Sequence, residues 1–217
     1  MIIVLLGPPG AGKGTQCKRV VEKYNLAHLS SGDILRAERA AGTKLGKKAQ
    51  SFMDSGGLVP DDVIISMMAS AIGKAGRGCV LDGFPRTVVQ AEELDKSLAK
   101  EQKKIDAVVN LVIDDDVVAH RLTGRRSCPK CGAIYHIESL KPKVKDICDK
   151  CGKALVQRSD DKSDVVKNRL KTYHAQTAAV VGYYQKVDKT IFDINADGDV
   201  GEITTAILKK LDKLATV

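Results

Sequence analysis

The stretch Gly7–Thr15, GPPGAGKGT, has the residue types and spacing of a loop that binds nucleotide phosphates. In the motif G-x-x-x-x-G-K-[ST], backbone N–H groups of a glycine-rich turn and of the next helix surround the phosphates. Lys13 adds a positive charge beside the outer phosphates. The motif normally continues with a hydroxyl that binds Mg²⁺, and here it continues with Gly14. We therefore expect phosphate oxygens and water to hold most of the metal, which Mg²⁺ tolerates because it gives up water reluctantly.

A second stretch with phosphate chemistry is VLDGFPRT, Val80–Thr87. Asp82 ends an apolar run, and ligands of open α/β sheets bind at the carboxyl ends of such strands. Its carboxylate can order the water shell of Mg²⁺, and Arg86 can bring a guanidinium to the same crevice. The alternatives are a turn or cap residue for Asp82 and a surface salt bridge for Arg86.

Four cysteines, Cys128, Cys131, Cys148 and Cys151, have the spacing C-x₂-C-x₁₆-C-x₂-C. This spacing is typical of zinc sites, and four thiolates complete a tetrahedron that leaves no open position. We therefore predict structural Zn²⁺. Two disulfides or an iron–sulfur cluster are the alternatives. His136 is interpreted as a neighbour rather than a ligand.

The elements that must position these residues alternate along the chain. Apolar runs predict parallel strands at 1–6, 79–82, 108–113 and 190–194, with a weaker one at 27–29. Helical patterns lie at 14–24, 61–74, 87–102, 114–122, 163–187 and 200–214. Cys17 and Cys79 fall within such core patterns and are expected to be buried thiols. The alternation predicts an α/β fold, a three-layer P-loop sandwich with a five-stranded parallel sheet.

Two segments interrupt this alternation, and both read as insertions on the sheet. Residues 30–59 predict two short helices broken at Gly42 and at Gly56–Gly57, whereas residues 125–162 are turn-rich and hold the four cysteines. The expected division is a core of 1–29, 60–124 and 163–217, with 30–59 and 125–162 as separate units.

Composition limits the classes of function. The 217 residues carry a net charge of +8, with 43% hydrophobic and 29% charged residues, as in ordinary soluble proteins. No apolar run approaches the ~20 residues of a membrane span, and no signal peptide is recognisable, so we expect a cytoplasmic protein. Nucleic-acid binding is disfavoured because the chain has no Trp and few aromatic residues for base stacking.

Taken together, the motifs resemble those of adenylate kinases. GPPGAGKGT, SSGDILR, GGLVPDD, LDGFPRT, HRLTGRR, RSDD and KNRL follow one another between about residues 1 and 198 in the family's order. Gly14 is usual in that family. The resemblance implies transfer of a phosphoryl group from ATP with Mg²⁺ to AMP, giving two ADP, by a monomer. A kinase for another nucleoside monophosphate and a zinc-ribbon nucleic-acid-binding ATPase remain as alternatives.

The resemblance also implies site residues. Residues 30–59 close over AMP, and 125–162 form a zinc-binding lid over ATP. Arg121 stacks on the ATP adenine, Asn195–Gly198 lie near it, and Asp160 holds an arginine or ties the lid to the core. ATP-binding residues are Gly10, Ala11, Gly12, Lys13, Gly14, Thr15, Arg121, Arg125, Ile134 and Tyr135. AMP-binding residues are Ser31, Arg36, Met53, Gly57, Leu58, Val59, Gly83, Phe84, Pro85, Arg86, Gln90, Arg158 and Arg169. Catalytic residues are Lys13, Asp82, Arg86, Arg125, Arg158 and Arg169.

Sequence spacing adds one geometric expectation about two of these arginines. Arg121 and Arg125 are four residues apart, so a helix ending at Gly124 would present both toward one side.

Overall fold

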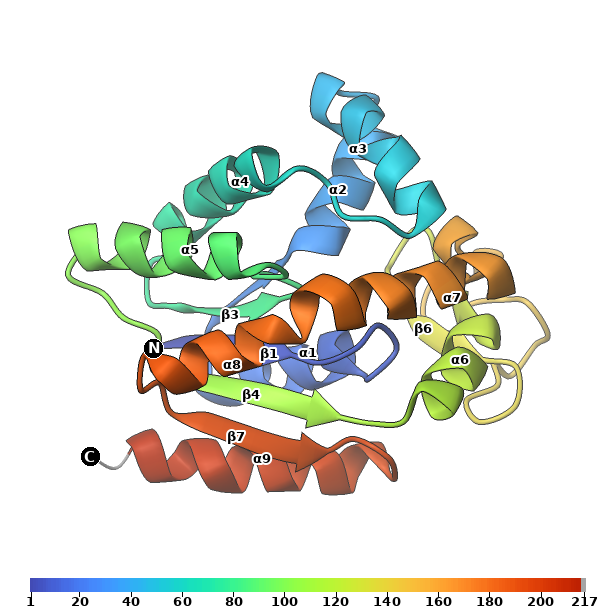
Figure 1. The fold of residues 1–217 in the computed structure, drawn as a ribbon. Coiled ribbons are helices and arrows are strands. Elements are labelled where there is room, and N and C mark those ends of the chain that lie inside the picture. The colour runs from blue at the N-terminus through green and yellow to red at the C-terminus, as the bar shows by residue number, and fades with distance from the viewer. Residues whose placement is uncertain (216–217) are drawn as a thin grey trace.

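A parallel sheet of five strands forms the middle layer of the computed structural model, which describes residues 1–215 (Figure 1). The strand order is β2-β3-β1-β4-β7, and every neighbouring pair is parallel. This confirms the predicted sheet, including its weakest strand. The strands are β1 (Ile2–Leu6), β2 (Ala27–Ser30), β3 (Cys79–Asp82), β4 (Ala107–Val112) and β7 (Ile191–Asn195).

The uninterrupted apolar run of β1 is explained by burial on both faces of the sheet. Val4 and Leu6 face a layer made by α4 (Asp61–Gly73), α5 (Val88–Lys100) and α8 (Ala179–Lys186). Ile3 and Leu5 face the opposite layer, made by α1 (Lys13–Tyr24) and α9 (Val200–Ala215). Side chains alternate across a strand, so a central strand between two helix layers has only apolar positions.

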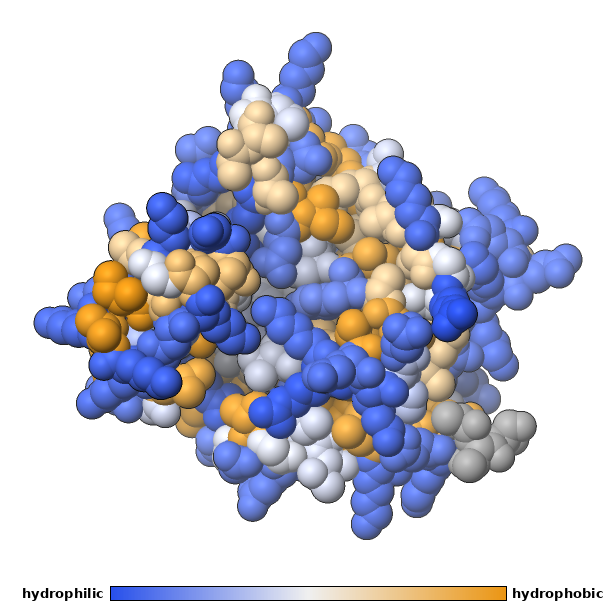
Figure 2. Space-filling model, turned by 180° about the vertical axis from the view of Figure 1, so that it is seen from behind, coloured by the Kyte–Doolittle hydropathy of each residue, from blue (hydrophilic) through white to orange (hydrophobic). Residues whose placement is uncertain are grey.

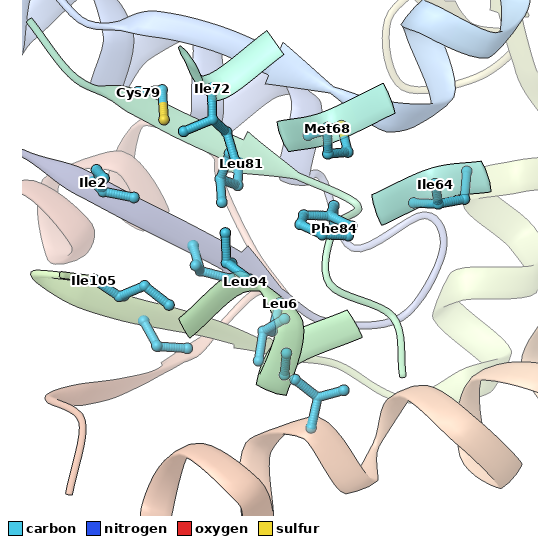
Figure 3. Packing of buried hydrophobic residues seen from close by; sticks show 14 of the residues in the cluster. Ile2, Leu6, Ile64, Met68, Ile72, Cys79, Leu81, Phe84, Leu94 and Ile105 are labelled. Carbon is cyan, nitrogen blue, oxygen red and sulfur yellow. The ribbon is translucent and has the colours of Figure 1, made fainter. Parts of the chain in front are cut away.

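Figure 3 shows the first of these layers, where Met68 and Ile72 of α4 pack over Leu81 of β3. Leu94 of α5 enters the same cluster, and Phe84 lies just beyond the end of β3. Each fully buried side chain of this size stabilises the fold by about 1.5–3 kcal/mol relative to an exposed one. The cluster therefore fixes the strand end from which Asp82 and Arg86 follow.

Residues 30–59, called the helical segment below, form α2 (Ser31–Ala40) and α3 (Lys44–Ser55). The Thr43 hydroxyl caps α3 by accepting a hydrogen bond from the Gly46 N–H, and Gly56 ends α3 with φ 78°. The predicted breaks at Gly42 and Gly56–Gly57 are confirmed. The two helices approach closely at Gly46, where a Cβ would overlap the backbone of Glu38.

Residues 125–162, called the cysteine segment below, contain a small antiparallel sheet of β5 (Arg125–Ser127) and β6 (Ile134–His136). The apolar cluster of the cysteine segment is small and is built from Cys128, Ala133, Tyr135, Cys148 and Leu155. The 3₁₀ turn Ser159–Asp161 ends the segment. In Figure 1 the segment lies beside α6 (Asp115–Thr123), on the side to which β4 and β7 point.

The long helix predicted over 163–187 is interrupted in the structure. It consists of α7 (Ser163–Thr172), a π-helical turn (Tyr173–Thr177) and α8. The Ala178 N–H donates to the Tyr173 carbonyl oxygen at 2.9 Å, five residues back. A π turn keeps the helical hydrophobic pattern on either side, so the pattern alone does not reveal it.

Candidate active site

The glycine-rich loop joins β1 to α1 at the carboxyl edge of the sheet. Gly7, Gly10 and Gly12 all have positive φ, and a Cβ at Gly7 would overlap the backbone of Leu111 in β4. Lys13 Nζ donates hydrogen bonds to the carbonyl oxygens of Gly7 and Pro8, both at 2.8 Å. Burial lowers the Lys13 pKa to about 8, although Asp82 opposes the shift. The ammonium is thus held inside the loop, where phosphates would surround it.

Asp82 lies against the place where the loop motif normally has a hydroxyl. A Cβ at Gly14 would be 3.2 Å from Asp82 Oδ2. The register of β1 and β3 sets Asp82 opposite Leu5, one strand away from the loop. The carboxylate therefore takes a position from which it can order water around a phosphate-bound cation.

Arg86 is fixed from two directions. Its Nε donates to the Gly83 carbonyl oxygen at 2.8 Å, and its backbone N–H donates to Gln90 Oε1 at 2.7 Å. Gln90 is buried and also donates to Asp61 Oδ1 at 2.8 Å, which leaves one N–H and one lone pair of its amide for a ligand. Burial, followed by repulsion from Arg169, lowers the Arg86 pKa to about 10.

Two further arginines converge on one buried carboxylate. Arg125 binds Asp161 with two hydrogen bonds, from Nε at 2.8 Å and from Nη2 at 2.5 Å. Arg169 donates to Asp161 Oδ1 at 3.2 Å and pairs with Asp160 at 3.0 Å. Asp161 is fully buried, so its carboxylate relies on these arginines for hydrogen bonds. Removing one partner of such a buried pair costs about 3–5 kcal/mol.

The arginines from both sides lie within electrostatic range of one another. Burial lowers the Arg158 pKa to about 10, with further contributions from Arg125 and Arg36. Arg36 also lowers the pKa of Arg86 and Arg169. Each of these positive charges makes the charged form of the others less favourable. An anion bound among them would therefore be stabilised.

The remaining residues predicted to bind AMP lie around this group. Ser31 Oγ donates to the Gly83 carbonyl oxygen at 2.6 Å, and Arg36 pairs with Asp33 at 2.6 Å. A Cβ at Gly56 would be 2.9 Å from Arg169 Cγ, so the end of α3 that leads into Gly57–Val59 lies beside that arginine. The side chains of Phe84, Pro85 and Val59 are buried, and Met53 packs partly against the core.

The expectation that Arg121 and Arg125 lie on one helix face is wrong. The last helical residue of α6 is Thr123, and Arg125 already belongs to β5. Arg121 Nη1 instead donates to the Ala196 carbonyl oxygen at 2.9 Å, so it lies against the predicted donor-adenine segment Asn195–Gly198. The two arginines therefore mark different parts of the site.

Tyr135 faces the interior of the cysteine segment rather than the crevice. Its hydroxyl accepts from the Asp149 N–H at 2.9 Å and lies 3.6 Å from Cys148 Sγ. Only backbone atoms of Tyr135 are therefore placed to contact a nucleotide. Its neighbour Ile134 is half-buried.

The four cysteine sulfurs form one group in which all Sγ atoms lie within 4.8 Å of one another. Cys128 and Cys151 are 3.3 Å apart, and Cys131 and Cys148 are 3.5 Å apart. These separations are too long for disulfides and close to the ~3.8 Å of sulfurs bound tetrahedrally at ~2.3 Å from zinc. The residues present therefore fit Zn²⁺. His136 lies outside the group, with Nδ1 accepting from the N–H groups of Glu138 and Ser139.

Comparison with known proteins decides between the alternative functions. A family model described as adenylate kinase matches residues 5–189. The chain belongs to the adenylate kinase family. The adenylate kinase of Methanothrix thermoacetophila is 48% identical over 215 residues, 98% of this chain and 99% of the relative. That of Archaeoglobus fulgidus is 45% identical over 216 residues, 99% of each chain. That of Thermodesulfovibrio yellowstonii is 46% identical over 215 residues, 98% of this chain and 100% of the relative.

The predicted function is thereby confirmed: this adenylate kinase is a phosphotransferase with ATP, AMP and ADP as substrates and Mg²⁺ as the cation of ATP.

Hydrophilic residues cover most of the face shown in Figure 2, and apolar residues appear there in small groups. Within residues 1–215, none of the helices combines the length and apolarity that crossing a bilayer requires.

Two acidic residues that hold predicted site residues in place were not themselves predicted from the sequence. Asp161 holds Arg125 and Arg169, and Asp61 holds Gln90. An arginine partner is predicted for Asp160. Because Asp161 is the acidic residue directly after it, the same role could have been predicted for Asp161. Asp61 lies in the first turn of α4, where an acidic residue complements the helix dipole, so the sequence gives no separate sign of its bond to Gln90.

Proposed function

We propose that this adenylate kinase binds ATP at Gly10–Thr15 and AMP beside the helical segment, and aligns their phosphates between Arg36, Arg86, Arg125, Arg158 and Arg169. The observation that carries this proposal is the pair of arginines, Arg125 and Arg169, fixed on the fully buried Asp161. Guanidinium groups held in place before substrate arrives stabilise transferred charge without reorganising during the reaction.

On the donor side, the loop N–H groups and Lys13 bind the ATP phosphates. The cation bound to ATP neutralises charge on the β- and γ-phosphates. Asp82 orders its water ligands from the end of β3, in the space that Gly14 leaves open. Arg121, Ile134, Tyr135 and the segment Asn195–Gly198 surround the donor base, with Arg121 held by Ala196.

On the acceptor side, Arg36 and Arg86 bind the AMP phosphate as two-pronged donors. The Gln90 amide reads the adenine edge with its remaining N–H and lone pair. Ser31, Met53, Gly57–Val59 and Gly83–Pro85 line the rest of the AMP site.

Transfer itself needs no general base in this arrangement. The AMP phosphate is already an anion and attacks the γ-phosphorus of ATP directly, while ADP leaves. Charge then spreads over the equatorial oxygens of the transferred group, where Arg86, Arg125, Arg158 and Arg169 act together with Lys13. Alignment and electrostatic stabilisation supply the rate enhancement.

We assign residues 1–29, 60–124 and 163–217 to the core, residues 30–59 to the AMP-binding unit and residues 125–162 to the lid; residues 216–217 of this division lie outside the described residues. A structural Zn²⁺ on Cys128, Cys131, Cys148 and Cys151 holds the lid together, and lid closure excludes water from the phosphoryl group. By family resemblance, the enzyme is a cytoplasmic monomer without nucleic-acid or membrane partners. Size-exclusion chromatography with light scattering tests the monomer.

The acceptor preference tests the site assignment directly. Coupled assays with ATP and AMP, GMP, CMP or UMP should give the highest kcat/KM for AMP. Gln90→Leu should raise KM for AMP more than it lowers kcat, because the base is bound equally before and during transfer. Another monophosphate with a kcat/KM equal to that of AMP would contradict the assigned acceptor site.

A further inference from the structure

A second group of metal-ligating side chains lies next to the phosphate loop. Cys17 on α1, His28 on β2 and Asp82 on β3 have donor atoms that all lie within 4.8 Å of one another. His28 Nε2 and Asp82 Oδ2 are 3.3 Å apart. Cys17 is fully buried, Asp82 is buried and His28 is half-buried. Among residues 1–215, this is the one such group besides the four cysteines of the lid.

The three donors suit a different class of cation from the Mg²⁺ of the reaction. Thiolate, imidazole and carboxylate are all zinc ligands, whereas Mg²⁺ takes oxygen ligands. With Zn–S near ~2.3 Å and Zn–N near ~2.1 Å, ligands of one tetrahedral ion lie about 3.3–3.8 Å apart. His28 Nε2 and Asp82 Oδ2 already have such a separation, and the Cys17 sulfur would have to move toward them by about 1 Å or less. Softness and geometry both favour a d-block divalent cation over Mg²⁺.

The surroundings leave such an ion an open position. Three protein ligands complete only part of a tetrahedron, as in sites that keep a place for water or substrate. Gly14 lies on the same side of Asp82 and has no side chain, and its Cβ position is 3.2 Å from Oδ2. Cys17 and Asp82 both act electrostatically on Lys13, so the group lies within range of the phosphate-binding ammonium.

We propose that Cys17, His28 and Asp82 form an inhibitory site for a d-block divalent cation such as Zn²⁺, separate from the lid zinc. An ion bound there engages the Asp82 carboxylate and removes it from the water shell of the magnesium on ATP. The inhibitory effect rests on the proposed function of Asp82, whereas binding through Cys17 and His28 does not.

The test uses the full-length enzyme with one zinc already bound in the lid. Metal-buffered Zn²⁺ is added at excess Mg-ATP, with the rate and the bound metal per chain measured together. A parallel Co²⁺ titration reports a thiolate ligand through its charge-transfer absorption. Cys17→Ser and His28→Gln remove one ligand each. Cys79→Ser is the matched control, because Cys79 is an equally buried thiol at the other end of β3.

The wild type and Cys79→Ser should bind a second ion and lose activity reversibly, with recovery on chelation. Cys17→Ser and His28→Gln should raise the Zn²⁺ concentration for half-inhibition about tenfold or more, as loss of metal-site contacts does. Cys17→Ser should also lose the thiolate–cobalt band that the wild type shows. Circular dichroism confirms folding of each variant, and either variant alone suffices if the other is unfolded.

Three outcomes would overturn the proposal. They are no second bound ion in the wild type, equal inhibition of the wild type and both ligand variants, or loss of the second site in Cys79→Ser as well. A second ion that binds through Cys17 without slowing the reaction would overturn the inhibitory role. The function of Asp82 is tested separately by the kcat of Asp82→Asn without added zinc, so the two failures are distinguishable.

Discussion

The Ser159 hydroxyl donates a 2.8 Å hydrogen bond to Asp54 Oδ1, joining the end of the cysteine segment directly to α3 of the helical segment. Asp54 also accepts from Arg39 at 2.9 Å. The hydrogen bond from Ser159, followed by that from Arg39, holds the Asp54 pKa below its usual range. The two units proposed to cover the substrates therefore contact each other through an ionised carboxylate.

Ser159→Ala should shift the free enzyme toward an open arrangement. A hydrogen bond of ordinary strength contributes about 0.5–1.5 kcal/mol, a factor of about 2 to 13 in an equilibrium, and the partial exposure of Asp54 keeps this bond in that range. Fluorescence energy transfer between labels on α3 and on the cysteine segment measures the shift. Ser55→Ala is the matched control, because Ser55 donates only to Phe52 of its own helix. Identical distance distributions in Ser159→Ala and the wild type would contradict the expectation.

The same contact should depend on pH. The Asp54 pKa is depressed, so the contact is present above the ordinary carboxyl pKa of about 4 and is lost as pH falls through the lower value of the folded protein. Acidification should therefore increase the label separation in the wild type. Asp54→Asn should remove this pH dependence.

Arg125→Lys should lower kcat by roughly 10²–10⁴ with the fold intact. Lysine keeps the charge but cannot make both hydrogen bonds to Asp161, and catalysis here depends on alignment and electrostatics. Arg126→Lys is the control, since Arg126 donates only to backbone carbonyl oxygens of Thr123 and Arg125. Steady-state kinetics and circular dichroism measure the two effects. Near-normal turnover in both Arg125→Lys and Arg86→Lys would rule out the arginine group as the catalytic element.

ATP affinity should fall as pH rises through about 8. Burial lowers the Lys13 pKa to about 8, so above that pH the free enzyme must take up a proton to bind the phosphates. Calorimetry at pH 8.5 in buffers of different ionisation enthalpy measures this uptake. Lys13→Arg keeps its charge and should show much less of it. Equal binding enthalpies in all buffers would refute the assignment.

Removing the zinc that we propose for the lid, or changing Cys148 to Ser, should loosen the cysteine segment before the core. Its own apolar cluster has five residues, so the metal supplies much of its folding energy. We expect about one zinc per chain in the reduced protein, and faster hydrogen exchange confined to 125–162 after its removal. Lys130→Ala between two ligands is a suitable control. Unchanged exchange in Cys148→Ser would show that the cysteines do not hold the segment.

The centre of the sheet was predictable because β1 and β3 are short, mainly apolar runs buried from both sides. Ile2–Leu6 and Cys79–Leu81 contain no polar residues, so neither run shows the 3.6-residue polar pattern of an amphipathic helix. The phosphate loop was predictable for a related reason. Its glycines mark backbone that only glycine adopts readily, and Lys13 has a fixed place after them.

Other features depend on contacts that local sequence does not carry. Asp161 becomes a support for Arg125 only because the cysteine segment returns to its starting point, 36 residues along the chain. Tyr135 turns inward, where its ring packs into the small cluster around Cys148 and its hydroxyl accepts a hydrogen bond from the Asp149 N–H. Arg121 and Arg125 separate because a helix terminus between them changes the backbone direction.

The π turn at Tyr173–Thr177 sets the rotation of α7 relative to α8. Val166 on α7 packs against Val118 and Leu122 of α6, whereas Tyr184 on α8 belongs to the core cluster over the sheet. Deleting one residue from the turn would rotate one helix about 100° against the other. Arg169 would then turn away from Asp161 while Tyr184 kept its place. The position of Arg169, which we propose to be catalytic, therefore depends on the number of residues in this turn, and the stretch should accept substitutions far more readily than changes in length.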